Sequence, residues 1–327
     1  MHILIVTNNP DRASFRQRME IYLDCLRAEG INCTVCRYPT YPVSRLKLLQ
    51  SSRDFDAVFL HKKRLNPLDA FLLRRYARKV IYDFDDAVMY DDNRPDKPSR
   101  KRQRDFQRTV KLADLVIAGN KYLAGLAGPL NNNVEVLPTG LDLAAYNVQT
   151  APNNDGKIRL VWIGSKATLP YLKGIKPAFE EIGSRFNNVV LRIICDHFFD
   201  LNNMQIEKKQ WSRQTEIIDL VTSDVGLAPL PDNPFTRGKC GFKILQYAAA
   251  GLPTVASPVG VNAELISNDS TGFLAVSSRD WVDCVCQLIQ NITLRRQMGD
   301  AARQSVRRFN SKLLANRLSE LIRSVTS

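Results

Sequence analysis

The chain has 327 residues, enough for two domains of ordinary size, each with its own hydrophobic core. Apolar residues make up 44% and charged residues 24% of the sequence, which excludes an intrinsically disordered chain. No apolar run approaches the roughly 20 residues that span a bilayer, and residues 2–6 resemble a strand. We therefore expect neither a membrane-spanning helix nor a signal peptide.

The net charge of +13 favours an anionic partner, such as nucleic acid, anionic lipid headgroups or a phosphorylated substrate. Much of the excess lies between residues 94 and 111, which contain Arg100, Lys101, Arg102, Arg104 and Arg108. A solvated helix face is the alternative explanation. Because this region offers only Phe106 for stacking on bases, nucleic acid is not an expected partner.

The seven cysteines are an odd number and are scattered, so a disulfide framework is not expected. Cys33 and Cys36 have the spacing of zinc ligands, but the sequence has no second Cys or His pair to complete a zinc site. They also fall within a predicted strand at 31–37. We expect reduced thiols in a cytoplasmic protein, and no metal site.

In the first half, short apolar runs alternate with helical stretches. A predicted strand at 2–6 is followed by Phe15, Met19, Tyr22, Leu23 and Leu26 at helical spacing, and Gly30 ends that helix. Further strands are predicted at 57–60, 80–82, 115–118 and 134–137. This alternation indicates a parallel sheet covered on both faces.

The polar, turn-rich segment 149–156 predicts a linker, after which the alternation begins again. Strands are predicted at 158–163, 189–194, 225–228, 253–256 and 273–276, and helices at 169–182, 213–222, 241–250 and 279–290. An apolar stripe in the last residues predicts a helix at 311–327 that packs back on the first domain. We therefore predict an α/β protein with two doubly wound, Rossmann-like domains, 1–150 and 151–310, and a ligand between them.

Residues 224–260 combine a buried strand, a polar loop and a helix that begins near Cys240 and Gly241. Free backbone N–H groups and the positive end of the dipole make a helix N-terminus suitable for a diphosphate. Arg237 and Lys239 on the loop, and Lys243 one turn into the helix, would add positive charge.

This segment resembles the retaining GT-B glycosyltransferases of family 4, also called group 1. Gln-Tyr-Ala-Ala-Ala-Gly-Leu-Pro-Thr-Val-Ala-Ser at 246–257 is similar to the family motif E-A-x-A-x-G-x-P-V-V-A-S. The run Gly-Lys-Cys-Gly-Phe-Lys at 238–243 resembles a bacterial subgroup found in surface-polysaccharide gene sets. The resemblance covers roughly residues 158–310. It implies a nucleoside-diphosphate sugar as co-substrate, no cofactor and no metal ion, with donor contacts from Arg237, Lys239, Gly241, Phe242, Lys243 and Gln246.

Two positions depart from the family motif, which places two glutamates eight residues apart. This chain has Gly238 and Gln246 there. Gln246 can hydrogen-bond ribose hydroxyls through its amide, whereas Gly238 has no side chain for the donor sugar.

A second donor element is predicted at 161–174, where a strand ends at Gly164. Ser165 and Thr168 are expected near the donor, with capping of the helix that begins near residue 169 as the alternative. The family commonly has Gly-Arg here. Because Ser165 replaces that arginine, Lys166 or Lys173 is expected to supply the cation.

In the first half, Asp83, Asp85 and Asp86 follow a predicted strand. Carboxylates so close together repel, which raises at least one pKa unless cations lie near. Metal binding and turn formation are the alternatives to a site role, in which Asp85 or Asp86 contacts sugar hydroxyls or accepts the acceptor's proton.

Two further candidates lie at predicted strand ends in the first half. His61 ends the strand at 57–60 and is expected in the cleft, although a lone histidine also serves structural roles. Arg16 and Arg18 follow the first strand, where they would suit a phosphate-bearing acceptor, with a solvated helix start as the alternative.

We therefore predict a retaining glycosyltransferase acting on a glycan or lipid-linked acceptor in bacterial surface polysaccharide or glycoconjugate synthesis. We expect it in the cytoplasm, peripheral at the inner face of the anionic membrane. The alternatives are a sugar-nucleotide epimerase of the same architecture and an inactive transferase-like binding subunit, the latter suggested by Gly238.

Overall fold

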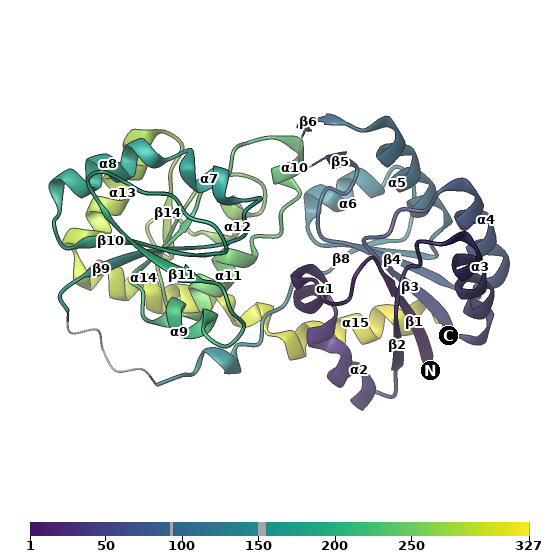
Figure 1. Ribbon diagram of the computed structural model, residues 1–327. Helices are drawn as coiled ribbons and strands as arrows, with labels where there is room; N and C mark the ends of the chain where they lie inside the picture. The colour runs from purple at the N-terminus through teal and green to yellow at the C-terminus, as the bar shows by residue number, and fades with distance from the viewer. Residues whose placement is uncertain (92–93, 150–154, 327) are drawn as a thin grey trace. The chain divides into compact units, whose positions relative to one another are not determined.

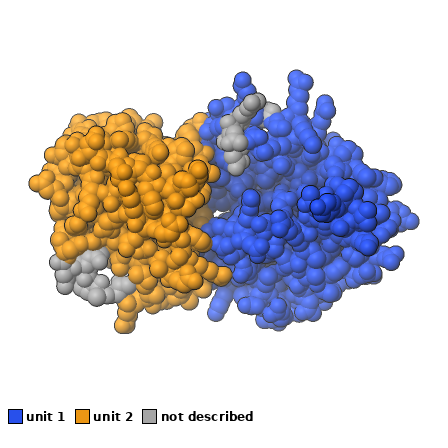
Figure 2. All heavy atoms as spheres, in the orientation of Figure 1, with its two compact units in different colours: residues 1–141, 233–240, 309–327 blue, residues 142–232, 241–308 orange. Residues whose placement is uncertain are grey.

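The computed structural model describes residues 1–91, 94–149 and 155–326 (Figure 1). They form two compact units, coloured separately in Figure 2. Unit 1 comprises residues 1–141, 233–240 and 309–327, and unit 2 comprises 142–232 and 241–308. The chain thus leaves unit 1 at residue 141 instead of 150, and 233–240 packs with unit 1. The predicted linker lies largely outside the described residues.

Unit 1 contains a six-stranded parallel sheet in the order β2-β1-β3-β4-β7-β8. The order reverses between β1 and β3, which makes this pair the topological switch point. The strands are β1 (His2–Thr7), β2 (Asn32–Arg37), β3 (Ala57–His61), β4 (Val80–Phe84), β7 (Leu115–Ala118) and β8 (Val134–Val136). A small antiparallel pair, β5 (Tyr90–Asp91) and β6 (Arg94–Pro98), follows β4.

Helices cover both faces of the unit 1 sheet, as the alternating sequence predicts. On one face α3, α4, α5 and α6 bury Leu49, Leu73, Val110 and Leu123, and on the other α1, α2 and α15 bury Phe15, Leu26 and Leu318. The helices are α1 (Ala13–Arg18), α2 (Leu23–Ala28), α3 (Pro42–Ser51), α4 (Pro67–Tyr76), α5 (Arg100–Leu112), α6 (Lys121–Ala127), α10 (Pro234–Arg237) and α15 (Ser311–Thr326), with short 3-10 turns η1 (Glu20–Tyr22) and η2 (Ser52–Asp54).

Unit 2 has a second six-stranded parallel sheet in the order β11-β10-β9-β12-β13-β14. This is the Rossmann order 3-2-1-4-5-6, with its switch point between β9 and β12. The strands are β9 (Ile158–Ile163), β10 (Val189–Cys195), β11 (Gln205–Gln210), β12 (Val225–Ala228), β13 (Thr254–Ala256) and β14 (Gly272–Leu274).

The helices of unit 2 are α7 (Leu169–Lys173), α8 (Lys176–Arg185), α9 (Glu216–Val221), α11 (Phe242–Ala249), α12 (Asn262–Leu265), α13 (Ser278–Gln290) and α14 (Ile292–Ser305), with 3-10 turns η3 (Ala144–Tyr146) and η4 (Val306–Phe309). The helix predicted at 169–182 is in fact two, α7 and α8, because the chain turns at Gly174 and Ile175.

The predicted fold class is confirmed: both halves are doubly wound α/β structures. In the described part of the chain, no helix is both long and apolar enough to cross a membrane. The seven cysteines are all free thiols.

Candidate functional site

The carboxyl edge of the unit 1 sheet brings several predicted site residues together. Thr7, His61 and Asp83 are register partners on β1, β3 and β4, so they form a row across three neighbouring strands. Thr7 and His61 lie at the switch point, where ligands of open α/β sheets bind. The Thr7 hydroxyl lies 3.1 Å from Nδ1 of His61.

His61 is buried, and the ring of Phe15 packs edge-on against its imidazole at 5.6 Å between centroids. Burial lowers the pKa of His61 to about 3, so the ring is neutral at physiological pH. Its Nε2 atom has no hydrogen-bond partner among the described residues. A neutral ring with one nitrogen anchored can donate to or accept from a ligand hydroxyl at the other nitrogen.

Arg18 is not available to a phosphate-bearing acceptor, the role predicted for it. Its side chain is buried, and Nη2 lies 2.6 Å from Oδ1 of Asp83. Nη1 also donates to the Leu137 carbonyl at 2.7 Å. This ion pair joins α1 to the sheet, so Arg18 has a structural role. Arg16 is half-buried and donates to the Asp11 carbonyl at 2.7 Å.

Cations surround Asp85 and Asp86, which removes the repulsion expected from the sequence. Nζ of Lys62 lies 2.7 Å from Oδ1 of Asp85 and 2.5 Å from Oδ2 of Asp86. Nζ of Lys239 lies 2.9 Å from Oδ1 of Asp86. Burial alone would raise the pKa of Asp86, but the two lysines hold it well below its usual range. Asp86 is therefore ionised at physiological pH.

The segment 233–240, which we call the strap, is docked on unit 1. Besides the Lys239–Asp86 pair, Nδ2 of Asn120 donates to the carbonyls of Gly238 and Lys239 at 3.2 Å. The Cys240 thiol donates to the Asp85 carbonyl at 3.2 Å. Two further contacts hold the strap. Phe235 is buried in the unit 1 core, and the Pro234 carbonyl accepts a hydrogen bond from the Tyr122 hydroxyl.

Gly238 of the strap packs closely against Ala87. A Cβ atom at this position would lie 2.7 Å from Cβ and 2.8 Å from N of Ala87, closer than real side chains approach. The docked strap therefore excludes any side chain at residue 238. Of the two loop cations predicted to bind diphosphate, Lys239 is paired with Asp86, and Arg237 is exposed at the end of α10.

In unit 2, the predicted donor residues Gly164, Ser165 and Thr168 follow β9, one of the two strands at the switch point. The Gly164 amide donates to the Ile194 carbonyl at 3.0 Å. The Thr168 hydroxyl accepts from the Ser165 amide at 3.2 Å, which closes a short turn. Thr168 is the N-cap residue of α7, but its side chain makes no capping hydrogen bond to the helix.

The second donor element of unit 2 is the start of α11. Gly241, its N-cap, has a φ of 65°, the left-handed region that favours glycine. Nζ of Lys243, the second residue of α11, lies 5.4 Å from the ring of Trp162 on β9. The Lys243 ammonium therefore lies near the strand that ends at Gly164.

The remaining donor candidates are placed less directly. Phe242 is half-buried at the first turn of α11, and Lys173 is exposed with its Nζ 5.7 Å from the ring of Phe199. Gln246 is buried, and its side chain acts to lower the pKa of Tyr146 in η3, which burial raises.

No group of three or more His, Cys, Asp or Glu side chains in the described ranges is arranged to hold a metal ion. Sequence reasoning missed Lys62, which bridges the two aspartates, and Asn120, which holds the strap. The position of Lys62 after a predicted strand end is the sequence feature that could have identified it as a site residue. Nothing in the local sequence of Asn120 identifies its strap contacts.

Comparison with known proteins agrees with this architecture. Residues 201–291 match the family model described as glycosyl transferases group 1. No curated protein sequence is a significant match. HepE from Anabaena, solved in complex with UDP, superposes with a TM-score of 0.74 at 15% identity, covering 99% of this chain and 100% of HepE.

Two further solved structures are similar over nearly their whole length. Sucrose-phosphate synthase from Thermosynechococcus elongatus has a TM-score of 0.72 at 14% identity, covering 99% of this chain and 98% of that protein. A glycosyltransferase from Rickettsia africae has a TM-score of 0.73 at 14% identity, with the same coverage. The chain therefore has the GT-B fold, and its residues 201–291 are similar to the group 1 glycosyl transferases.

Proposed function

We propose that this protein transfers a sugar from a nucleoside-diphosphate donor to a hydroxyl acceptor, with retention at the anomeric carbon and without a metal ion. One observation carries the proposal. In unit 2, the switch point of a Rossmann-ordered sheet coincides with residues 164–168, and the group 1 match covers the α11 element. HepE, which has the same fold, is solved with UDP and with UDP-glucose, so uridine is the first base to test.

In the proposed reaction, the acceptor oxygen bonds to the anomeric carbon as the bond from that carbon to the diphosphate breaks. The departing diphosphate oxygen takes the acceptor's proton. The protein then has to orient both substrates and stabilise charge on the leaving group. Lys243 and the N-terminus of α11 at Gly241, both in unit 2, are assigned to the diphosphate, and Arg237 stays a prediction from the sequence.

Unit 1 is assigned to the acceptor. Nε2 of His61 is buried at the β1–β3 switch point without a partner among the described residues, and we assign it to the acceptor hydroxyl. Asp85 lies at the same edge, whereas Asp86 is held by two lysines and positions the strap. We propose a glycan or lipid-linked acceptor of bacterial surface polysaccharide or glycoconjugate synthesis, with the protein peripheral at the inner face of the cytoplasmic membrane.

Thermal unfolding with UDP, GDP, dTDP, CMP and NAD tests the donor site. A nucleoside diphosphate at a hundredfold excess over its dissociation constant should stabilise the protein by about 2.7 kcal/mol. NAD should not, because no Gly-x-Gly-x-x-Gly follows β1 or β9. Stabilisation by NAD alone would contradict the proposal.

Two variants test the phosphate contacts. Lys243→Ala and Arg237→Ala should each weaken binding of the stabilising nucleotide by about 1.5–3 kcal/mol, the value of a hydrogen bond to a charged group. Arg296→Ala, an exposed arginine on α14, is the matched control and should bind as wild type does. Wild-type binding by both test variants would place the phosphates elsewhere. Turnover of a labelled nucleotide sugar separates a transferase from an inactive binding subunit.

A further inference from the structure

The outer surface of α3, α4 and α5 carries exposed apolar side chains. Tyr41 is 76% exposed and Val43 66% exposed at the start of α3, and Leu68 and Phe71 on α4 are 64% and 67% exposed. Leu68 and Phe71 are three residues apart, so they share one face of their helix. Single exposed apolar residues are ordinary, but a group on two neighbouring helices indicates an interaction surface.

These helices lie on one face of the unit 1 sheet, so their outward sides belong to one surface. The side chains of Leu49, Leu73 and Val110 point from α3, α4 and α5 into the same core. The helices α3 and α4 are in contact, as are α4 and α5. Arg45 on α3 also pairs with Asp69 on α4, with 3.0 Å between Nη1 and Oδ2.

The same surface is strongly basic. Helix α5 has six basic residues and one aspartate, and its Arg100, Lys101, Arg104 and Lys111 are exposed. The aspartate, Asp105, is paired with Arg108 at 2.7 Å. Arg74 and Arg75 on α4, and Arg78 just after it, are exposed; Arg74 pairs with Asp114 and Arg78 with Asp56. The only acidic residue of α4 itself, Asp69, is buried.

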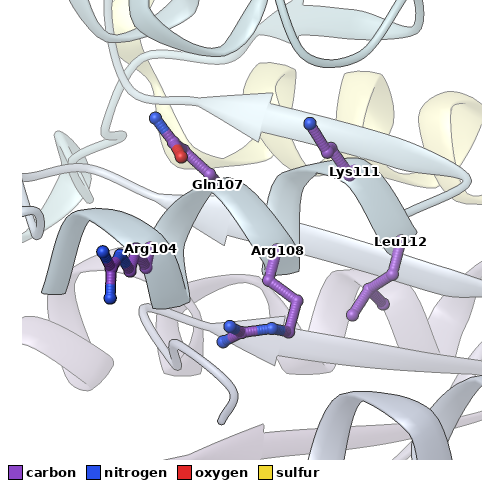
Figure 3. Close-up of a pocket in the computed structure, with 5 residues that line it drawn as sticks. All are labelled: Arg104, Gln107, Arg108, Lys111 and Leu112. Atoms are coloured by element: carbon purple, nitrogen blue, oxygen red, sulfur yellow. The ribbon is translucent and has the colours of Figure 1, made fainter. Parts of the chain in front are cut away.

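A hollow of about 480 Å³ lies beside α5, lined by Arg104, Gln107, Arg108, Lys111 and Leu112. In Figure 3, Gln107 and Lys111 project from one edge of the helix, and Arg104, Arg108 and Leu112 from the other. Arg108 is held by Asp105, but the exposed Arg104 and Lys111 and the Gln107 amide match the charge and hydrogen-bonding needs of a phosphate-bearing headgroup.

We propose that this surface docks on an anionic lipid bilayer. Basic side chains of α5 contact the headgroups, and Leu68, Phe71, Tyr41 and Val43 enter the boundary between headgroups and acyl chains. The aliphatic side chains of Val43 and Leu68 favour a bilayer over a nucleic acid, because they neither pair with phosphates nor stack on bases. The inference builds on the proposed lipid-linked acceptor by naming the surface that meets the membrane.

Co-sedimentation with vesicles tests the surface. The full chain should bind phosphatidylglycerol-containing vesicles at 0.1 M salt and not vesicles of phosphatidylcholine alone, and 1 M salt should weaken binding as the Debye length shrinks from about 10 Å to 3 Å. Arg104→Gln with Lys111→Gln should weaken binding about 30-fold, because each basic residue near an anionic surface contributes about 1 kcal/mol. Leu68→Ser with Phe71→Ser should weaken it about 100-fold or more and abolish the binding that remains in 1 M salt, because each apolar side chain that leaves water contributes about 1.5–3 kcal/mol.

Matched pairs of exposed residues elsewhere serve as controls. Val276→Ser with Ile292→Ser, and Arg296→Gln with Lys312→Gln, should bind vesicles as wild type does. Equal binding to neutral and anionic vesicles, binding to neither, or equal losses in the control pairs would overturn the proposal. The proposal would also be overturned if the chain bound single-stranded nucleic acid tightly while Leu68→Ser with Phe71→Ser bound vesicles as wild type does. Nucleotide stabilisation, measured on the same variants, reports separately on the proposed transferase function.

Discussion

Lys62 connects two carboxylates at the carboxyl edge of the unit 1 sheet. Its φ of 55° is uncommon for a residue with a side chain, and such strain is typical of functional sites. That conformation follows directly after β3 and lets the ammonium bridge Asp85 and Asp86. From the sequence we expected the neighbouring carboxylates to repel each other unless cations lie near. The backbone turn that brings the Lys62 ammonium to two of them could not be predicted.

His61 should make the protein sensitive to mild acid. Its folded pKa of about 3 lies below the ordinary value of 6.5, so between these values the unfolded chain binds one more proton. The stabilising contribution is complete above pH 6.5, and falls by up to about 1.4 kcal/mol for each pH unit below it. Urea unfolding of wild type and His61→Gln across this range should give a steeper pH dependence in wild type.

The difference between these two proteins should be constant well above the ordinary histidine pKa, which provides an internal control. Parallel pH dependences throughout the acid range would mean that His61 is not buried in the neutral form. The buried Thr7 contact and the packing of Phe15 would then have to differ from those described here.

At the scale of elements, the apolar runs predicted most strands because buried parallel strands are nearly continuous runs of Val, Ile and Leu. β11 was missed for the converse reason. Its sequence, Gln-Ile-Glu-Lys-Lys-Gln, is charged because it forms an exposed edge of the unit 2 sheet. The docking of the strap on unit 1 could not be predicted either, since its local sequence specifies a capped turn and not the surface on which the turn packs.

The close contact between Gly238 and Ala87 predicts that a side chain at residue 238 releases the strap from unit 1. Gly238→Glu restores the family's residue type, but its Cβ would meet Ala87, so we expect the strap to leave unit 1 at a cost of about 1–3 kcal/mol. Amide hydrogen exchange of residues 233–240 should accelerate accordingly. Arg237→Glu places the same side chain at the exposed neighbouring position and should leave this exchange near wild type.

Unchanged exchange in Gly238→Glu would mean that the strap accommodates a side chain at this position. The glutamate could then take the role that the family resemblance gives it. Accelerated exchange in both variants would mean that added negative charge near Asp86 releases the strap, and not the volume of the side chain at residue 238.

At the scale of the whole molecule, unit 1 is assembled from three separate parts of the chain. Its first 141 residues form the sheet, the strap comes from the middle of the second half, and α15 is the last helix of the chain. The apolar stripe of α15 was read correctly from the sequence, and Leu318 and Ile322 are buried against Ile3, Ile5 and Tyr22. The sequence periodicity identified the helix face, while only the structure identifies the residues it covers.

Truncating α15 side chains should therefore loosen the start of the chain. Leu318→Ala should destabilise unit 1 by about 2–5 kcal/mol, the cost of a lost apolar side chain and the cavity that it leaves. In amide hydrogen exchange, β1 and α2 should lose protection, because α15 packs on α2 and shares a core with β1. Leu313→Ala, 59% exposed on the same helix, is the matched control and should stay within about 0.5 kcal/mol of wild type. A loss of protection confined to β9 and β10 in unit 2, with β1 unaffected, would contradict the assignment of α15 to the core of unit 1.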